Sequence, residues 1–199
     1  LWPILHPGFV KGILPIGGSA NTQSDPIVRD LFQLMTAAIE SDPVWRQTQG
    51  DYYDRPKPEH PNQGVEFGWS IISHTGTGFD HQFAQGWEAK QKDTFVWGES
   101  DLGSNLKAKS RAYDANDLLY RNQALFTFDI RPYLPLIKVP TLIVHVQNDQ
   151  WLRVQNAAFA RQQIPGARLL TFADPLAHYA IFKAPQQFTA EIAAFLKGL

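Results

Sequence analysis

The sequence predicts an α/β fold built on a parallel sheet, and three observations support this prediction. Short apolar runs, which indicate buried strands, alternate with amphipathic helical stretches in the last third of the chain. Such an alternation is typical of parallel strands joined by right-handed crossovers. An acid, Asp149, and a histidine, His178, each come shortly after one of these predicted strands. The 199 residues are enough to bury a sizeable core.

The first part of the chain predicts a helix end, a strand and two capped helices. Residues 2–7 have the pattern of a helix end followed by a turn, and residues 9–16 that of a strand. Asp25 followed by Pro26 predicts a helix start, because the carboxylate can cap the first turn. Residues 41–45 predict a second capped start. The apolar stripe expected on the first helix consists of Ile27, Leu31, Leu34, Met35, Ala38 and Ile39.

The middle of the chain has a different pattern, with many prolines and glycines between short amphipathic pieces. Such pieces occur near residues 64–74 and 79–92 and suggest short helices. We therefore expect residues 25–124 to form a helical cap or lid. This insertion would interrupt an α/β core made of residues 1–24 and 125–199.

The alternation of strand and helix returns in the last sixty residues. Residues 140–146 predict a buried strand and residues 152–163 a helix. Residues 167–172 predict the next strand, and a last amphipathic helix is expected from Pro185 to Leu196. In open α/β sheets the ligand lies beyond the carboxyl ends of the strands.

Asp149 and His178 both fall just beyond such carboxyl ends, although they are 29 positions apart. An acid followed by a histidine is the second half of the Ser–Asp–His order of α/β hydrolases. His178 would take the proton of a serine hydroxyl, and Asp149 would orient the imidazole and stabilise its cation. Asp174 is the competing acid, but its place before Pro175 and close to His178 favours a role in capping a turn.

The serine that should precede this pair is not found on the expected motif. Ser19, Ser70 and Ser100 each lack glycine at one of the two flanking positions of G-x-S-x-G. The chain has no cysteine, so a thiol nucleophile is excluded. We expect the chain to begin partway through the helix that follows the nucleophile, with the serine upstream of Leu1.

Composition and charge narrow the classes of partner. The chain carries 18 basic and 19 acidic residues without a basic cluster, which argues against nucleic acid. No apolar run approaches the roughly 20 residues of a membrane span. No cluster of histidines at ligand spacing is present, so no metal site is predicted. The compartment stays open: the cytoplasm is slightly favoured over a periplasmic or secreted location.

Beyond these patterns, the chain resembles the homoserine O-acetyltransferase group of the α/β-hydrolase superfamily. The resemblance rests on "HPGFVKGILPIGGSA", "SDPVW", "YDANDLL", "IKVPTLIVHVQNDQWL" and "PGARLLTFADPLAHYAIF". It implies the α/β-hydrolase fold, of which this chain would be the C-terminal portion of the parallel sheet with an inserted helical cap. It also implies that the family's acid and histidine fall on Asp149 and His178, and that its serine lies upstream of Leu1.

Departures from the family pattern bear on the substrate. The family's G-H-D is A-H-Y at residues 177–179, so Tyr179 replaces an acid expected to meet the amino group of homoserine. The arginines of two cap phrases are missing at residues 64–69, which contain Trp69, and at residues 79–85. A zwitterion bound there would leave buried charges unpaired. We therefore expect Tyr179 and Trp69 to contact a less polar ester.

The sequence is compatible with three functions. The leading one is a serine-type acyl hydrolase, in other words a carboxylic ester hydrolase or esterase. The first alternative is a CoA-dependent O-acetyltransferase of the homoserine O-acetyltransferase type, and the second is a non-catalytic fragment or binding module. We expect no cofactor, with acetyl-CoA as a co-substrate only in the transferase. The expected partners are a small-molecule ester or acyl donor and an N-terminal segment carrying the nucleophile, and a homodimer is left open.

Overall fold

The computed structural model of the protein describes residues 1–78, 81 and 112–199. The predicted helix near residues 79–92 therefore lies outside the described residues, apart from His81.

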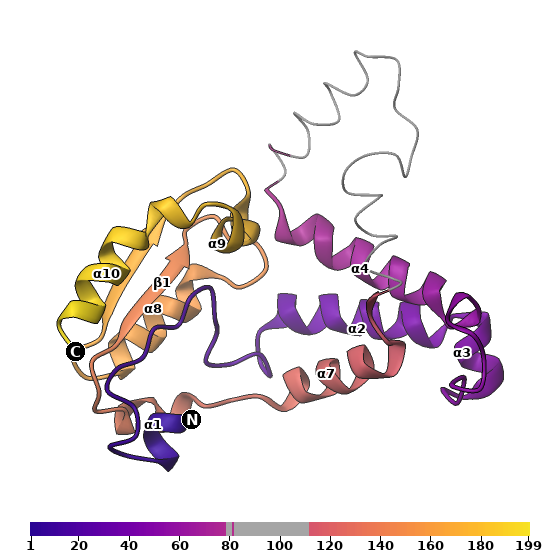
Figure 1. The fold of residues 1–199 in the computed structure, drawn as a ribbon, viewed down its shortest axis with the longest axis horizontal. Coiled ribbons are helices and arrows are strands. Elements are labelled where there is room, and N and C mark those ends of the chain that lie inside the picture. Colours follow the sequence, from indigo (N-terminus) through magenta and orange to yellow (C-terminus); the bar gives the residue numbers. More distant parts are fainter. Residues whose placement is uncertain (79–80, 82–111) are drawn as a thin grey trace. The chain divides into compact units, whose positions relative to one another are not determined.

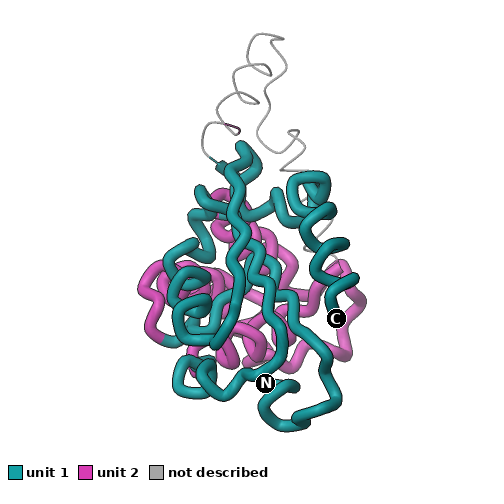
Figure 2. Tube along the Cα trace, turned by 90° about the vertical axis from the view of Figure 1, so that its left-hand side faces the viewer, with its two compact units in different colours: residues 1–23, 76–78, 128–199 teal, residues 24–75, 79–127 magenta. Residues whose placement is uncertain are grey.

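The chain forms two compact units, which Figure 2 distinguishes by colour. Unit 1 comprises residues 1–23, 76–78 and 128–199, and unit 2 comprises residues 24–75 and 79–127. The predicted division into a core of residues 1–24 and 125–199 and a cap of residues 25–124 stays a prediction, as does the assignment of the helical unit as a cap over an active site.

Unit 1 contains a small parallel sheet. Strand β1, Leu142–Val146, pairs in parallel with strand β2, Arg168–Phe172, in a register that joins Leu142 to Arg168 and Val146 to Phe172. All five residues of β1 are buried, as expected for a parallel strand that is covered on both faces. Both strands were predicted from the sequence at nearly these positions.

A third chain segment lies along the other edge of β1, but it is shorter than the strand predicted at residues 9–16. Parallel bridges join Ile13 to Thr141 and Ile16 to Val144. Pro15 occupies the ladder position between them and has no N–H to donate, which interrupts the hydrogen-bond pattern. Phe9 is 75% exposed and outside the pairing, so the prediction was wrong for the start of this strand.

Helices cover the sheet of unit 1 (Figure 1). Helix α8, Val154–Gln163, follows β1, and helices α9, Ala180–Lys183, and α10, Thr189–Lys197, follow β2. Because side chains of a strand alternate between faces, β1 contributes to two apolar cores. One core contains Leu142, Val144 and Val146 with Ala180, Ala184, Phe188 and Phe195, and the other contains Ile143 with Ala157, Ala160 and Ile164.

Short helical elements complete unit 1. They are α1, Trp2–Leu5, and the 3₁₀ helices η2, Arg131–Leu136, η3, Ala177–Tyr179, and η4, Pro185–Gln187. The last predicted helix was expected to open at Pro185. The structure instead forms η4 there, and the α-helix starts four residues later.

Unit 2 is helical in its described part. It contains α2, Pro26–Glu40, α3, Pro43–Thr48, the 3₁₀ helix η1, Lys57–Glu59, most of α4, Asn62–Gly76, and α7, Ala115–Thr127. The two predicted caps are confirmed: the carboxylates of Asp25 and Asp42 accept backbone N–H groups at the starts of α2 and α3.

The buried face of α2 differs slightly from the predicted stripe. Val28, Leu31, Phe32, Met35 and Ile39 are buried, whereas Leu34 is 54% exposed. The buried face is therefore turned toward Val28 and Phe32, because α7 and α4 pack there.

Helix α4 lies unusually close to α2 at two glycines one helical turn apart. A Cβ added at Gly64 would lie 2.9 Å from the Cα of Ile39, and one added at Gly68 would lie 2.7 Å from Cγ of Met35. The N–H of Gly64 also donates to Oδ2 of Asp42, at 2.8 Å. The glycines are thus needed for this helix contact.

Candidate active site

Asp149 is held by its own loop beyond the end of β1. Its backbone N–H donates to the carbonyl of Val146, at 3.3 Å, which turns the chain. Its Oδ1 accepts the backbone N–H groups of Trp151 and Leu152, at 2.8 and 2.9 Å. The side chain is completely buried. These contacts fix the carboxylate and leave its second oxygen for another donor.

The group bound to this second oxygen is the imidazole of His178, the histidine predicted from the sequence. His178 lies in η3, in the loop that follows β2. Its Nδ1 is 2.7 Å from Oδ2 of Asp149, and its side chain is 7% exposed. Because Nδ1 is bound by the carboxylate, Nε2 is the ring nitrogen that can exchange a proton with a reactant. The fold therefore brings the two predicted residues into contact, while their catalytic role stays a proposal.

Asp174, the competing acid, makes different contacts. Its Oδ1 accepts the backbone N–H of Leu176, at 2.9 Å, as expected for a residue that caps a turn. Its backbone pairs with the side-chain amide of Asn148: the Asp174 carbonyl accepts Nδ2 at 2.9 Å, and its N–H donates to Oδ1 at 3.2 Å. Asn148 thus joins the acid loop to the histidine loop.

Aromatic rings surround the imidazole of His178. The ring of Trp151 is 4.5 Å from it, centroid to centroid, at an angle of 64°. Tyr179 and Phe182 follow at 6.5 and 6.3 Å, and Phe182 is 68% exposed. Tyr179 was predicted to contact substrate. Sequence reasoning missed Trp151, Phe182 and Asn148, and the only signal was their closeness in sequence to Asp149 and His178.

The chain also passes close to the imidazole at Gly17. This residue has a φ of 57°, and a Cβ added there would lie 2.8 Å from Cδ1 of Ile181 and 3.7 Å from Cε1 of His178. Glycine therefore permits both the left-handed turn and the close approach beside the histidine.

Trp69, the other residue predicted to contact substrate, lies in unit 2. It is 7% exposed, and its ring is 5.0 Å from that of Tyr113 and 5.4 Å from the guanidinium carbon of Arg121. These contacts belong to the core of the helical unit. A substrate contact by Trp69 stays a prediction.

A second histidine, His145, is completely buried within β1. Its Nδ1 is 3.1 Å from the carbonyl oxygen of Val146, whereas its Nε2 has no hydrogen-bond partner. Burial lowers the pKa of His145 below its ordinary value. Only one of the two ring nitrogens of His145 therefore has a hydrogen-bond partner.

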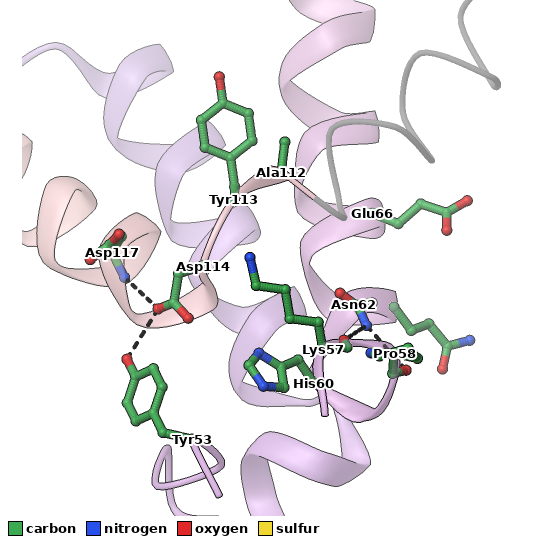
Figure 3. Close-up of a pocket in the computed structure, with 11 residues that line it drawn as sticks. Tyr53, Lys57, Pro58, His60, Asn62, Glu66, Ala112, Tyr113, Asp114 and Asp117 are labelled. Atoms are coloured by element: carbon green, nitrogen blue, oxygen red, sulfur yellow. Dashed lines mark hydrogen bonds between the residues drawn. The ribbon is translucent and has the colours of Figure 1, made fainter. Parts of the chain in front are cut away.

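Unit 2 contains a cavity of about 1010 Å³ between η1, the start of α4 and the start of α7 (Figure 3). Its wall carries Lys57, His60 and Glu66, and Asp114 accepts a hydrogen bond from Tyr53 at 3.2 Å. Neither member of the Asp149–His178 pair lines this cavity.

In the described ranges no three His, Cys, Asp or Glu side chains gather as they would around a metal ion. No helix within those ranges has the length and apolar character needed to cross a bilayer.

Comparisons with known proteins gave matches among solved structures only. No family model and no curated protein matches the chain. An acetylester hydrolase from Corynebacterium glutamicum matches all of this chain and 56% of its own, with 22% identity and a TM-score of 0.78. The acetyl esterase MekB, 19% identical, matches 98% of this chain and 57% of its own with a TM-score of 0.80. A homoserine O-acetyltransferase from Bacillus anthracis, 14% identical, matches 98% and 55% with a TM-score of 0.77.

These likenesses define the fold. The chain has an α/β-hydrolase-like partial fold, with a small parallel sheet and many helices, and it spans a little over half the length of the proteins it matches. The similarity is to a group that contains both esterases and a homoserine O-acetyltransferase, as the sequence motifs indicated.

Proposed function

We propose that this chain supplies the aspartate and the histidine of the catalytic triad of a serine-type carboxylic ester hydrolase. The observation that carries the proposal is the hydrogen bond of 2.7 Å between His178 Nδ1 and a fully buried Asp149 carboxylate. The pair lies beyond the carboxyl ends of two parallel strands, where α/β folds bind their ligands. The serine would come from a segment outside residues 1–199, since no G-x-S-x-G motif occurs within them.

In the first half of the reaction the serine is acylated. The serine oxygen attacks the ester carbonyl carbon while its proton passes to Nε2 of His178. The carbon–oxygen bond to the alcohol then breaks, and the alcohol leaves with the proton from Nε2. Asp149 stays ionised and stabilises the imidazolium that forms between these two transfers.

In the second half water replaces the alcohol. Nε2 takes a proton from the water as its oxygen attacks the acyl-serine carbonyl. The bond between the carbonyl carbon and the serine oxygen then breaks, and the serine recovers its proton from Nε2. The products are a carboxylic acid and the free enzyme.

The surroundings of the histidine support an uncharged substrate. Its ring neighbours are Trp151, Tyr179 and Phe182, which offer aromatic surface and no full charge. An amino acid acceptor needs a partner for its ammonium and for its carboxylate, and unpaired buried charges are costly. A short, uncharged ester meets no such penalty.

The second candidate is a CoA-dependent O-acyltransferase. The likeness to a homoserine O-acetyltransferase favours it, because that match has a TM-score of 0.77, close to the 0.78 and 0.80 of the matches to two esterases. The two candidates share an acyl-serine and differ in whether water or an alcohol attacks it.

One competition assay separates them. The protein, produced as its gene encodes it, is given acetyl-CoA and homoserine together, and free acetate and O-acetylhomoserine are both measured. A parallel sample receives p-nitrophenyl acetate with and without homoserine. We expect acetate release from the ester, unaffected by homoserine. Dominant O-acetylhomoserine would overturn the hydrolase proposal in favour of the transferase.

A further inference from the structure

The residue before His178 has an unusual backbone conformation. Ala177 has a φ of 47°, in the left-handed region that alanine rarely adopts. Among the described residues that are not glycine, only Gln49 shares a positive φ. Gln49 ends helix α3, a place where left-handed residues are common. Ala177 ends no helix and is completely buried, so its conformation has to be imposed by the contacts around it.

Those contacts come partly from the histidine loop itself. The N–H of Ala177 donates to the carbonyl of Asp174, at 2.9 Å, and the N–H of Tyr179 donates to the carbonyl of Leu176, at 3.1 Å. The loop therefore forms two successive turns, and the left-handed residue sits between them. A change in the φ of Ala177 would redirect the side chain that follows, which is that of His178.

Further contacts with this loop come from residues 76–78, which also belong to unit 1. A Cβ added at Gly78 would lie 2.3 Å from the carbonyl oxygen of Pro175 and 3.8 Å from the Cβ of Ala177. A Cβ added at Gly76 would lie 3.0 Å from Cε2 of Tyr179. Both glycines thus lie directly against the histidine loop. Gly78 faces residues that precede His178 in the sequence, and Gly76 faces Tyr179, which follows it.

We propose that residues 76–78 form a seat that holds Ala177 in its left-handed turn and thereby aims His178 at Asp149. This inference rests on the proposed function, in which that pair transfers protons. Ala177, Gly76 and Gly78 are positioning residues, because none of them provides an atom to the reaction. In this proposal the buried methyl group of Ala177, on the side of the loop that faces Gly78, opposes relaxation of the turn.

Two variants test the seat. Gly78→Ala places a methyl group 2.3 Å from the Pro175 carbonyl oxygen, and since that atom is backbone the loop must move. A misplacement of about 1 Å can cost about 100-fold in rate, so we expect kcat for p-nitrophenyl acetate to fall about 10- to 100-fold with little change in KM. Ala177→Gly accepts the same φ without steric cost but frees the turn. It should lower kcat severalfold while the melting temperature stays equal or rises.

The control and the second readout separate positioning from folding. Gly198→Ala is the matched control, because its methyl group would meet only ordinary contacts in the same unit, the nearest at 3.5 Å. The low-field proton resonance of the His178 Nδ1–H···Asp149 hydrogen bond is recorded for each protein. This signal needs no turnover, so it tests the seat even if the proposed function fails, a failure that ester hydrolysis unaffected by His178→Ala would reveal.

The expected result is a weakened or shifted resonance with reduced kcat in Gly78→Ala and Ala177→Gly, and wild-type behaviour in Gly198→Ala. A wild-type resonance in a folded Ala177→Gly protein would overturn the proposal, whatever happens in Gly78→Ala. A lower melting temperature in Ala177→Gly, with kcat unchanged, would also overturn it, because Ala177 would then only stabilise the fold.

Discussion

At the scale of single residues, the candidate site depends on how fully the Asp149 carboxylate is bound. Two backbone N–H groups hold one oxygen, and the imidazole of His178 binds the other. Two of these three donors are backbone groups of the loop itself. The orientation of the acid is therefore largely independent of the side chains at Trp151 and Leu152.

This independence leads to a prediction for Trp151. Trp151→Ala removes the ring that lies 4.5 Å from the imidazole but keeps the N–H that donates to Asp149. Aromatic pairs contribute about 0.5–1.5 kcal/mol, so kcat/KM for p-nitrophenyl acetate should fall up to about tenfold. Trp151→Phe should restore most of the loss. A decrease as large as that of His178→Ala would show that the ring does more than flank the imidazole.

Among the helices and strands, the close contact between α2 and α4 gives a prediction for the stability of unit 2. Gly64→Ala and Gly68→Ala each add a methyl group where the other helix lies within 3.0 Å. Forcing extra atoms into a packed contact costs about 1–3 kcal/mol, so each variant should lower the free energy of unfolding by that amount. Gln63→Ala, on an exposed position of the same helix, is the control. Urea denaturation measures all three, and wild-type stability in both glycine variants would contradict the close packing.

Strand β1 gives a prediction about pH, through His145. Burial lowers the pKa of this histidine in the native protein. At a pH just below the ordinary histidine pKa, the unfolded chain therefore binds a proton at His145 that the native protein does not bind. Stability is therefore lost as the pH falls from the unfolded-state pKa toward the lower native one. The loss is at most about 1.4 kcal/mol per pH unit for a single group.

The measurement compares the wild type with His145→Asn. Urea denaturation at pH 7.5 and at pH 5 gives the difference in unfolding free energy between the two proteins at each pH. The advantage of the wild type should shrink at pH 5, because the variant lacks the titrating ring. An advantage that does not change with pH would show that His145 is protonated to the same degree in both states.

Across the whole molecule, the features that could be predicted from the sequence are those that depend on neighbouring residues. The apolar runs located β1 and β2, and Asp25 and Asp42 marked helix starts, since strands and caps depend on neighbouring residues. Leu34 was misplaced because the buried face of α2 is decided by α4 and α7, which are distant in sequence.

The candidate site was predictable to a similar extent. Asp149 and His178 could be paired because their order and their places after strands are set by the chain itself. Asn148 could not be found, since its partner Asp174 is 26 residues away and no pattern marks the contact. The left-handed φ of Ala177 was equally hidden, because neither glycine nor asparagine, the residues that usually signal such a conformation, stands at this position.

The chain as a whole should also lack a reactive serine. If residues 1–199 are produced alone, a fluorophosphonate probe should label them no faster than free serine, because none of their serines stands on a G-x-S-x-G turn. Gel fluorescence and mass spectrometry of the labelled peptide provide the readout. Rapid labelling of Ser19, Ser70 or Ser100 would show that the nucleophile lies within these residues after all.

Turnover of p-nitrophenyl acetate tests whether Asp149 and His178 are the aspartate and histidine of a catalytic triad that hydrolyses esters. The protein is produced as its gene encodes it, and Asp149→Asn is compared with Asp174→Asn, the matched control from the neighbouring loop. Asp149→Asn should lower kcat by about 10⁴-fold with the fold intact, because the imidazole loses its correct tautomer, whereas Asp174→Asn should stay near the wild type. Near-normal turnover in Asp149→Asn together with a collapse in Asp174→Asn would contradict the assignment.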